Sequence, residues 1–257
     1  MTPRALPRVL IVAGSDSGGG AGIQADIKTV TMLGGHAMTA ITAITAQNTL
    51  GVQAVHPVPA DMVVAQMRSV IDDLGLDAVK VGMIGSAGTA QAVADVLEGL
   101  DVPVVVDPVM VATSGSVLAD AETVAALERL IARATLVTPN LPECDALGGL
   151  DALLARAPAV LAKGGHAEGA TVIDRLFDAS GEVARWENPR IDTRHTHGTG
   201  CTLASAIATG LGAGMALPAT IERAIAFVRA SLERAPGLGH GHGPMGQQDA
   251  TGFRCPD

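Results

Sequence analysis

The stretch HTHGTGCT, residues 195–202, places a cysteine directly after a Gly-Thr-Gly turn, where an apolar helical pattern begins. If a helix starts there, the backbone N–H groups of Gly200 and Cys201 face outward at the positive end of the helix dipole. Such a turn would bind an anion and favour the thiolate of Cys201, which could then accept a proton. Two other interpretations stay open: a small cysteine buried in the core, or a base supplied by His195 or His197.

Two further polar motifs follow short apolar runs. Asp107 ends the run in VVVDPVM (104–110), and Asn140 and Glu143 lie in TPNLPE (138–143). Ligand crevices in open α/β sheets lie at the carboxyl ends of strands. An acid and an amide there suit a hydrated Mg²⁺ with phosphate oxygens, because Mg²⁺ takes few protein ligands and keeps water. The alternative is that Asn140 and Glu143 only cap the next helix.

Lys163 lies in LAKGGH (161–166), just past a predicted strand and before two glycines. A lysine at that position could meet a phosphate as a point charge. Against this stands the more common case of a solvated surface lysine.

The glycine-rich stretch AGSDSGGGAGIQAD (13–26) lies between a predicted strand and a predicted helix. A dinucleotide-binding fingerprint would need a third glycine at position 23, which is Ile23, and no Gly-Lys-Ser/Thr is present for a phosphate-binding Walker A loop. The stretch therefore indicates either a tight connection or a loop whose backbone approaches a small ligand, with Asp16 or Asp26 as acceptor.

Strands and helices alternate over most of the chain. Short apolar or Thr/Ile-rich runs predict strands at 8–14, 37–45, 77–85, 102–108, 135–140 and 157–166. Helical spacing and stop signals predict helices at 21–34, 59–75, 89–100, 119–134, from near Cys201, and at 217–234. Segments 169–178 and 181–187 are predicted to pair as an antiparallel hairpin. This order predicts a three-layer α/β sandwich, with a mostly parallel sheet and helices on both faces.

The composition narrows the class of protein. The 257 residues are 48% apolar and only 2% aromatic, which predicts one domain with a large aliphatic core. The net charge of −9 without a basic run argues against a nucleic-acid partner. Three irregularly spaced cysteines argue against a disulfide framework, and no apolar run is long enough to cross a membrane. We expect a cytoplasmic protein with a loosely ordered, Gly-rich tail over about 243–257.

Together the motifs resemble the bacterial hydroxymethylpyrimidine/phosphomethylpyrimidine kinases of the ribokinase superfamily. The resemblance extends from about residue 8 to 243, and its motifs follow in the family's order and approximate spacing. They are AGSDSGGGAGIQAD, ITAITAQNTLGVQ, KVGMIG, VVVDPVM, TPNLPE, KGGH and HTHGTGCT.

The resemblance implies a ribokinase-like fold and a reaction. That reaction is the ATP-dependent phosphorylation of 4-amino-5-hydroxymethyl-2-methylpyrimidine, and then of its monophosphate, in thiamine biosynthesis, with ATP and Mg²⁺ required. The matching positions imply a pyrimidine pocket at Gly14, Asp26, Gln47 and Met83; a nucleotide site at Asn140, Lys163 and Thr196; metal ligands Asp107 and Glu143; an anion hole at Gly198, Thr199 and Gly200; and Cys201 as catalytic base.

Two departures from the family pattern stand out. Gly18 replaces a usual serine, which is expected to loosen the first loop, and residues 148–158 are shorter than usual, near the expected nucleotide side. Pyridoxal kinase is the nearest rival function, and a non-catalytic regulator on the same fold is a more distant one. The failed glycine spacing disfavours an NAD-dependent oxidoreductase. A homodimer is expected.

Overall fold

The structure is a computed structural model that describes residues 6–111, 115 and 118–255. Within these residues one sheet has the strand order β3-β2-β1-β4-β5-β6-β7-β8-β9. The strands are β1 (Arg8–Asp16), β2 (His36–Asn48), β3 (Gly51–Pro57), β4 (Ala78–Val81), β5 (Val104–Val106), β6 (Leu136–Val137), β7 (Ala159–Ala162), β8 (Thr171–Asp178) and β9 (Gly181–Pro189). The helices are α1 (Gly22–Met32), α2 (Ala60–Leu74), α3 (Ala87–Glu98), α4 (Ala121–Arg133), α5 (Leu141–Ala146), α6 (Gly149–Leu154), α7 (Thr199–Gly212) and α8 (Leu217–Glu233).

The predicted, mostly parallel sheet is confirmed. Strands β2, β1, β4, β5, β6 and β7 pair in parallel, whereas β3, β8 and β9 join antiparallel at the two edges. The predicted hairpin at 169–178 and 181–187 is the β8–β9 pair. Strand β3 was not predicted: its residues are almost all exposed, so GVQAVHP lacks an apolar face to mark it.

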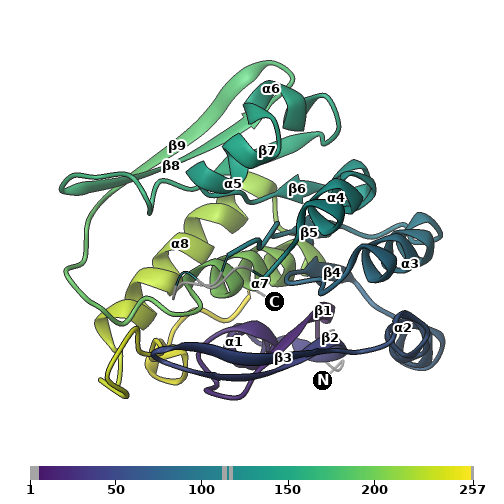
Figure 1. Cartoon of the computed structure of the whole chain (residues 1–257). Coiled ribbons are helices and arrows are strands. Elements are labelled where there is room, and N and C mark those ends of the chain that lie inside the picture. Colours follow the sequence, from purple (N-terminus) through teal and green to yellow (C-terminus); the bar gives the residue numbers. More distant parts are fainter. Residues whose placement is uncertain (1–5, 112–114, 116–117, 256–257) are drawn as a thin grey trace, which may run out of the picture.

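Helices cover both faces of the sheet (Figure 1). The side of α2, α3 and α4 packs on Leu10 and Val12 of β1, and the side of α1, α7 and α8 packs on Val9 and Ile11. Because successive residues of a strand point to opposite faces, an unbroken apolar run is what a strand between two helical layers requires. The aliphatic composition is thus divided between two cores.

The parallel strands bring their carboxyl ends to one edge of the sheet. Asp107 and Lys163 follow β5 and β7 directly, and Asn140 stands three positions after the last residue of β6, so these residues, far apart in sequence, become neighbours. The predicted strand at 77–85 is shorter than expected, because β4 ends at Val81. Residues 82–85 leave the ladder there, which places Met83 in a loop at the same edge.

The end of the chain is packed, which corrects the expectation of a loosely ordered tail over 243–257 as far as Cys255. Met245, Gln247 and Ala250 are buried, and the Cys255 amide donates to the carbonyl of Leu33 at 2.9 Å. The Phe253 ring lies 5.6 Å from that of Phe227, centroid to centroid. Because the segment is rich in glycine, its few apolar residues did not predict from the sequence that it would pack. Its last two residues lie outside the described part of the chain.

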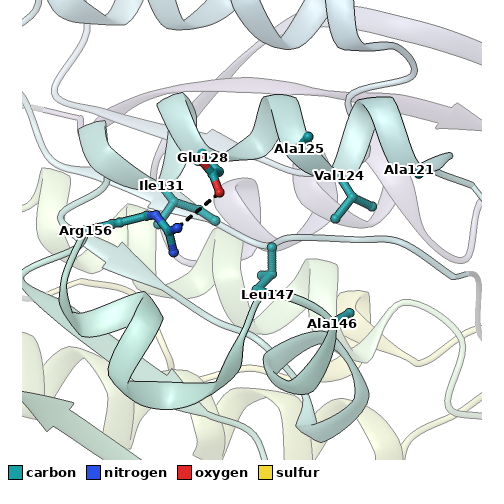
Figure 2. A pocket seen from close by; sticks show the side chains of 8 residues that line it. All are labelled: Ala121, Val124, Ala125, Glu128, Ile131, Ala146, Leu147 and Arg156. Atoms are coloured by element: carbon teal, nitrogen blue, oxygen red, sulfur yellow. Dashed lines mark hydrogen bonds and ion pairs between the residues drawn. The ribbon is translucent and has the colours of Figure 1, made fainter.

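The shortened stretch 148–158 folds as the single helix α6, followed by a turn into β7. A small depression of about 230 Å³ lies between α4 and the α5–α6 turn, and Figure 2 shows its lining. The Arg156 guanidinium and the Glu128 carboxylate form an ion pair at 3.1 Å across it. None of the predicted site residues lines this depression. No helix in the described ranges is both long and apolar enough to span a bilayer.

Candidate active site

One cavity of about 820 Å³ opens at the carboxyl edge of the sheet. It brings together every predicted site residue except Asp26. Its lining includes Gly14, Gln47, Met83, Asp107, Asn140, Glu143, Lys163, Thr196, Gly198, Thr199, Gly200 and Cys201. Residues that sequence reasoning placed in separate motifs therefore share one site.

The predicted helix start near Cys201 is confirmed, since α7 begins at Thr199. Gly198 has a φ of +86°, and a Cβ there would overlap the carbonyl oxygen of Gly20. Glycine is therefore required at this turn. The amides of Gly200 and Cys201 lie in the first turn, where no intrahelical acceptor exists, so both are free for an anion in the cavity.

The expected preference for the Cys201 thiolate is wrong for the unliganded site. Burial raises the pKa of the thiol to about 11, and the nearby charges of Asp26 and Asp107 add to the shift. The positive charge of Lys80 and a hydrogen bond from the Gly22 amide oppose it without reversing it. Desolvation therefore outweighs the charge of Lys80 and the Gly22 hydrogen bond, and Cys201 is a protonated thiol at neutral pH.

A cluster of charges faces the first turn of α7. The Nζ of Lys163 lies 2.7 Å from the Asp107 carboxylate and 3.9 Å from that of Glu143. Thr138 donates its hydroxyl to the same oxygen of Asp107 at 3.1 Å. A Cβ on Gly200 would lie 3.2 Å from Asp107 and 3.4 Å from Lys163. Lys163 is therefore no solvated surface lysine: its ammonium is held by carboxylates beside the helix amides.

Asn140 and Glu143 form a capping box at the start of α5. The Glu143 amide donates to Asn140 Oδ1 and the Asn140 amide donates to Glu143 Oε2, both at 2.8 Å. The capping interpretation is thus confirmed, yet both residues also line the cavity. Burial raises the pKa of Glu143 to about 7; Lys163 opposes the shift, and the Asp107 charge adds to it.

The opposite wall of the cavity is built from the glycine-rich loop and β2. Gly14 packs against Met83, whose sulfur would lie 3.0 Å from a Cβ at position 14. The side chain of Gln47 lies beside His197, with 3.2 Å between Gln47 Nε2 and His197 Nε2. This wall offers one amide and one thioether to a small ring.

Asp26 does not line the cavity, which corrects its expected role as a substrate contact. It is fully buried on the inward face of α1, where its carboxylate accepts from Lys80 Nζ at 2.9 Å and from the Ser205 hydroxyl at 2.7 Å. Burial raises the pKa of Asp26, and Lys80 opposes the rise. Its helical position faces the sheet, so it supports the site from beneath.

Two functional positions were missed or left open by sequence reasoning. Lys80 lies at the floor of the cavity, and a lysine inside the apolar run DAVKV was the signal that could have revealed it. His197, weighed only as a rival base, bonds Asp16 at 2.9 Å between Nε2 and Oδ2. Arg190, Arg229 and apolar residues of α8 extend the cavity, and no motif marked them.

The loop that carries Gly18 is firmly held, contrary to the expected loosening. The Gly18 amide donates to Asp16 Oδ1 at 2.8 Å, and Ser17 exchanges two hydrogen bonds with the backbone of Gln47. A Cβ at position 18 would lie 3.2 Å from both the Asp16 side chain and the Gln47 carbonyl oxygen. These contacts leave little room for a larger residue.

This fold and site define the chain as a ribokinase-like kinase of small molecules. Among solved structures, an ADP complex of Bacillus subtilis pyridoxal kinase matches with a TM-score of 0.86 and 32% identity, over 95% of this chain and 98% of that one. A phosphomethylpyrimidine kinase from Clostridium difficile matches with a TM-score of 0.72 and 33% identity, over 87% of this chain and 98% of that one.

Sequence comparison gives the family. The family model for phosphomethylpyrimidine kinase matches residues 16–246. A hydroxymethylpyrimidine/phosphomethylpyrimidine kinase from Streptomyces coelicolor is 47% identical over 97% of both chains, and one from Bacillus subtilis is 44% identical over 92% of this chain and 93% of that one. The chain belongs to the phosphomethylpyrimidine kinase family.

The buried pair of Lys80 and Asp26 gives a first prediction. Lys80→Met should lower the free energy of unfolding by about 3–5 kcal/mol, because it leaves a buried carboxylate without its partner. Urea denaturation measures the loss. Adding Asp26→Leu should restore most of the stability. Arg129→Met, which breaks the exposed pairs with Asp95 and Glu98, is the control and should leave the free energy of unfolding almost unchanged. An equal loss in Lys80→Met and the control would contradict the assignment.

The raised pKa of Glu143 gives a second prediction. The folded protein binds more protons than the unfolded chain between the ordinary pKa of 4.5 and about 7, so Glu143 lowers stability as pH rises through that range. Glu143→Gln keeps the cap, because glutamine also suits this position. Relative to this variant, the wild type should lose up to about 3 kcal/mol between pH 4.5 and 7, at about 1.4 kcal/mol per pKa unit.

The measurement is urea denaturation at several pH values, without nucleotide and with a chelator present. The quantity compared is the difference in the free energy of unfolding between wild type and Glu143→Gln at each pH, because other groups titrate equally in both proteins. Stability curves that run parallel from pH 4.5 to 7 would show that Glu143 has an ordinary pKa.

Proposed function

We propose that this chain catalyses the ATP-dependent phosphorylation of 4-amino-5-hydroxymethyl-2-methylpyrimidine, and of its monophosphate, in thiamine biosynthesis. The observation that carries the proposal is a single cavity with two chemically different ends. Gln47 and Met83 line one end, and Lys163 with the α7 amides lines the other. The names of the related kinases fit both steps.

The two ends divide the work. Gln47 has an amide that can both donate to and accept from a heteroaromatic edge. Asn140, Lys163 and Thr196 face the nucleotide, and the amides at the start of α7 stabilise charge that develops on the transferring phosphoryl group. Neighbouring kinases solved with ADP or with AMP-PCP and pyridoxal support a nucleotide and a small ring in one cavity.

The donor set fits magnesium. Asp107 and Glu143 share one lysine, which leaves the pair short of positive charge. Mg²⁺ is commonly held by one or two carboxylates together with waters and phosphate oxygens. These two residues therefore suffice, although the described part of the chain gathers no group of three His, Cys, Asp or Glu side chains. When bound, the ion neutralises negative charge on the phosphate oxygens.

In the first phosphorylation the substrate hydroxyl oxygen bonds to the γ-phosphorus, and the bond from that phosphorus to the β-γ bridging oxygen breaks, which releases ADP. The hydroxyl proton must leave, and Cys201 is the proposed acceptor. Because its thiol is protonated in the unliganded site, the reactive thiolate is a minor form that grows as pH rises. In the second phosphorylation the nucleophile is a phosphate oxygen that is already ionised, with a second pKa near 6.

The setting of the enzyme is proposed on indirect grounds. One domain carries the whole activity, because every described strand belongs to the same sheet. Cys144 and Cys201 are free thiols, which suits the reducing cytoplasm. The exposed apolar side chains of Ile44, Leu50 and Val55 on β2, β3 and their connection support a homodimer through that edge.

Pyridoxal phosphorylation is the second candidate function. It is favoured by the TM-score of 0.87, at 29% identity, with Staphylococcus aureus pyridoxal kinase, which is higher than the 0.72 for the Clostridium difficile phosphomethylpyrimidine kinase. A coupled assay of ADP release with hydroxymethylpyrimidine, its monophosphate and pyridoxal separates the two. We expect turnover of both pyrimidines. Turnover of pyridoxal alone would overturn the proposal.

The base role of Cys201 predicts unequal losses in the two steps. Cys201→Ala should lower kcat about 10²–10⁴-fold with the hydroxymethyl substrate, the usual contribution of a general base. With the monophosphate the loss should be much smaller, because that nucleophile needs no base. In the wild type, kcat/KM for the alcohol should still rise with pH at pH 9, and Cys201→Asp should lose that rise.

The measurement is the initial rate with each substrate at saturating ATP, with thermal melting to confirm folding. An equal loss in both steps would mean that Cys201 positions substrate rather than moving a proton. A near-normal kcat for Cys201→Ala with the alcohol would exclude the cysteine as base.

A further inference from the structure

The Asp16 carboxylate is the centre of a small hydrogen-bond network beside the pyrimidine end of the cavity. It is buried and accepts from the amides of Gly18, Gly20 and Ala21 at 2.8, 3.0 and 2.8 Å. Burial opposes its charge, but hydrogen bonds from His197 and from these amides hold its pKa below the usual range. Asp16 is therefore ionised and can only accept hydrogen bonds.

His197 contacts two partners through the same nitrogen. Its Nε2 lies 2.9 Å from Asp16 Oδ2 and 3.2 Å from the side-chain amide of Gln47. Because the ionised carboxylate offers no hydrogen, His197 Nε2 must carry one and donate it. The same nitrogen cannot also accept from an NH₂ group. The two terminal atoms of the Gln47 amide must therefore exchange places, so that its oxygen rather than Nε2 faces His197.

The contacts of the second terminal atom of the Gln47 amide agree with this orientation. That atom lies 3.1 Å from Thr45 Oγ1, and the same hydroxyl oxygen is 2.9 Å from the carbonyl oxygen of Ser15. A hydroxyl has one hydrogen, which goes to Ser15, and its lone pair then accepts from the NH₂ group of Gln47. With the oxygen toward His197 and the nitrogen toward Thr45, the one hydrogen on His197 Nε2 is shared between the Asp16 carboxylate and the Gln47 oxygen, and the NH₂ group of Gln47 donates to Thr45.

We infer that His197, held by Asp16, is a positioning residue that fixes the orientation of the Gln47 amide and thereby sets the hydrogen-bond pattern read on the substrate ring. The inference rests on the proposed function. Gln47 keeps one N–H and one oxygen lone pair for a ligand. An aminopyrimidine edge offers the complement, a ring-nitrogen acceptor beside an amino donor.

The backbone of Gln47 is fixed independently of His197. Its amide donates to Ser17 Oγ at 2.8 Å, and the Ser17 hydroxyl donates to its carbonyl at 2.7 Å. Loss of the imidazole should therefore free the side-chain amide without moving the strand. It should also leave Lys163 in place, because that ammonium is held by Asp107 and Glu143, and it should leave the first turn of α7 in place, because the His197 amide still donates to the Gly243 carbonyl at 3.2 Å. This separates recognition of the ring from phosphoryl transfer.

The test compares His197→Ala, His197→Gln and Lys28→Met. Lys28 donates to the Gly19 carbonyl in the same loop at 2.8 Å and does not touch Gln47, so its variant controls for a weakened loop. Calorimetric titration with 4-amino-5-hydroxymethyl-2-methylpyrimidine gives Kd without turnover, and steady-state rates give KM and kcat. His197→Ala should raise Kd and KM about tenfold, with kcat and the KM for ATP changed less than threefold. Lys28→Met should leave Kd, both KM values and kcat near those of the wild type.

Two further results decide the mechanism. His197→Gln should recover part of the affinity, because its amide can still donate near the position of Nε2. Gln47→Leu should weaken binding by a similar factor, and adding His197→Ala should cause no further loss, since both act through one amide. The inference would be overturned if the fold-losses of affinity in the two single variants multiplied in the double variant, or if Kd were unchanged in His197→Ala. Wild-type protein that binds the pyrimidine but does not phosphorylate it would contradict the proposed function alone.

Discussion

The active site depends on one close approach, between the backbone of the glycine-rich loop and the turn that begins α7. A Cβ on Gly198 would overlap the Gly20 carbonyl oxygen, and a Cβ on Gly20 would lie 2.5 Å from the His197 ring. Only glycine allows these segments to touch. The contact joins the loop after β1, for which we propose contact with the substrate ring, to the helix amides that we propose for a phosphate. Asp16 and His197 add a side-chain hydrogen bond of 2.9 Å across it.

The second constraint is electrostatic. Lys163 is shared by Asp107 and Glu143 at the cavity wall, and Lys80 is paired with Asp26 beneath it. Neither lysine is free to leave its carboxylate, so the positive charge is fixed before any ligand arrives. Such fixed charge needs no reorganisation during reaction. Desolvation also keeps Cys201 protonated, against the opposing charge of Lys80.

Much of this arrangement was predictable from the sequence, for identifiable reasons. Buried strands such as VLIVA carry an unmistakable apolar run, and polar residues just beyond strands converge wherever strands are parallel. That logic placed Asp107, Asn140 and Lys163 in one site. Prediction from the sequence failed for the orientation, burial and desolvation of single side chains. The inward direction of Asp26, the burial of Lys80 and the desolvation of Cys201 depend on what packs from other elements. Strand β3 and the packed end of the chain lack the periodic spacing of apolar residues that predicts strands and helices.

On the proposed function, this chain and the pyridoxal kinases share a fold and differ in the ring that they phosphorylate. A fold shared at a TM-score of 0.86 with a pyridoxal kinase leaves the scaffold around the phosphates in common. Discrimination must then come from the end of the cavity that contacts the ring. A polar site rejects a ring that leaves its buried hydrogen-bonding groups unpaired far more strongly than an apolar pocket rejects a change of shape. Gln47 can discriminate in this way only if its donor and acceptor ends are fixed. The network of Asp16, His197 and Thr45 supplies that fixed orientation, so ring selectivity here depends on residues behind the amide as much as on the amide itself.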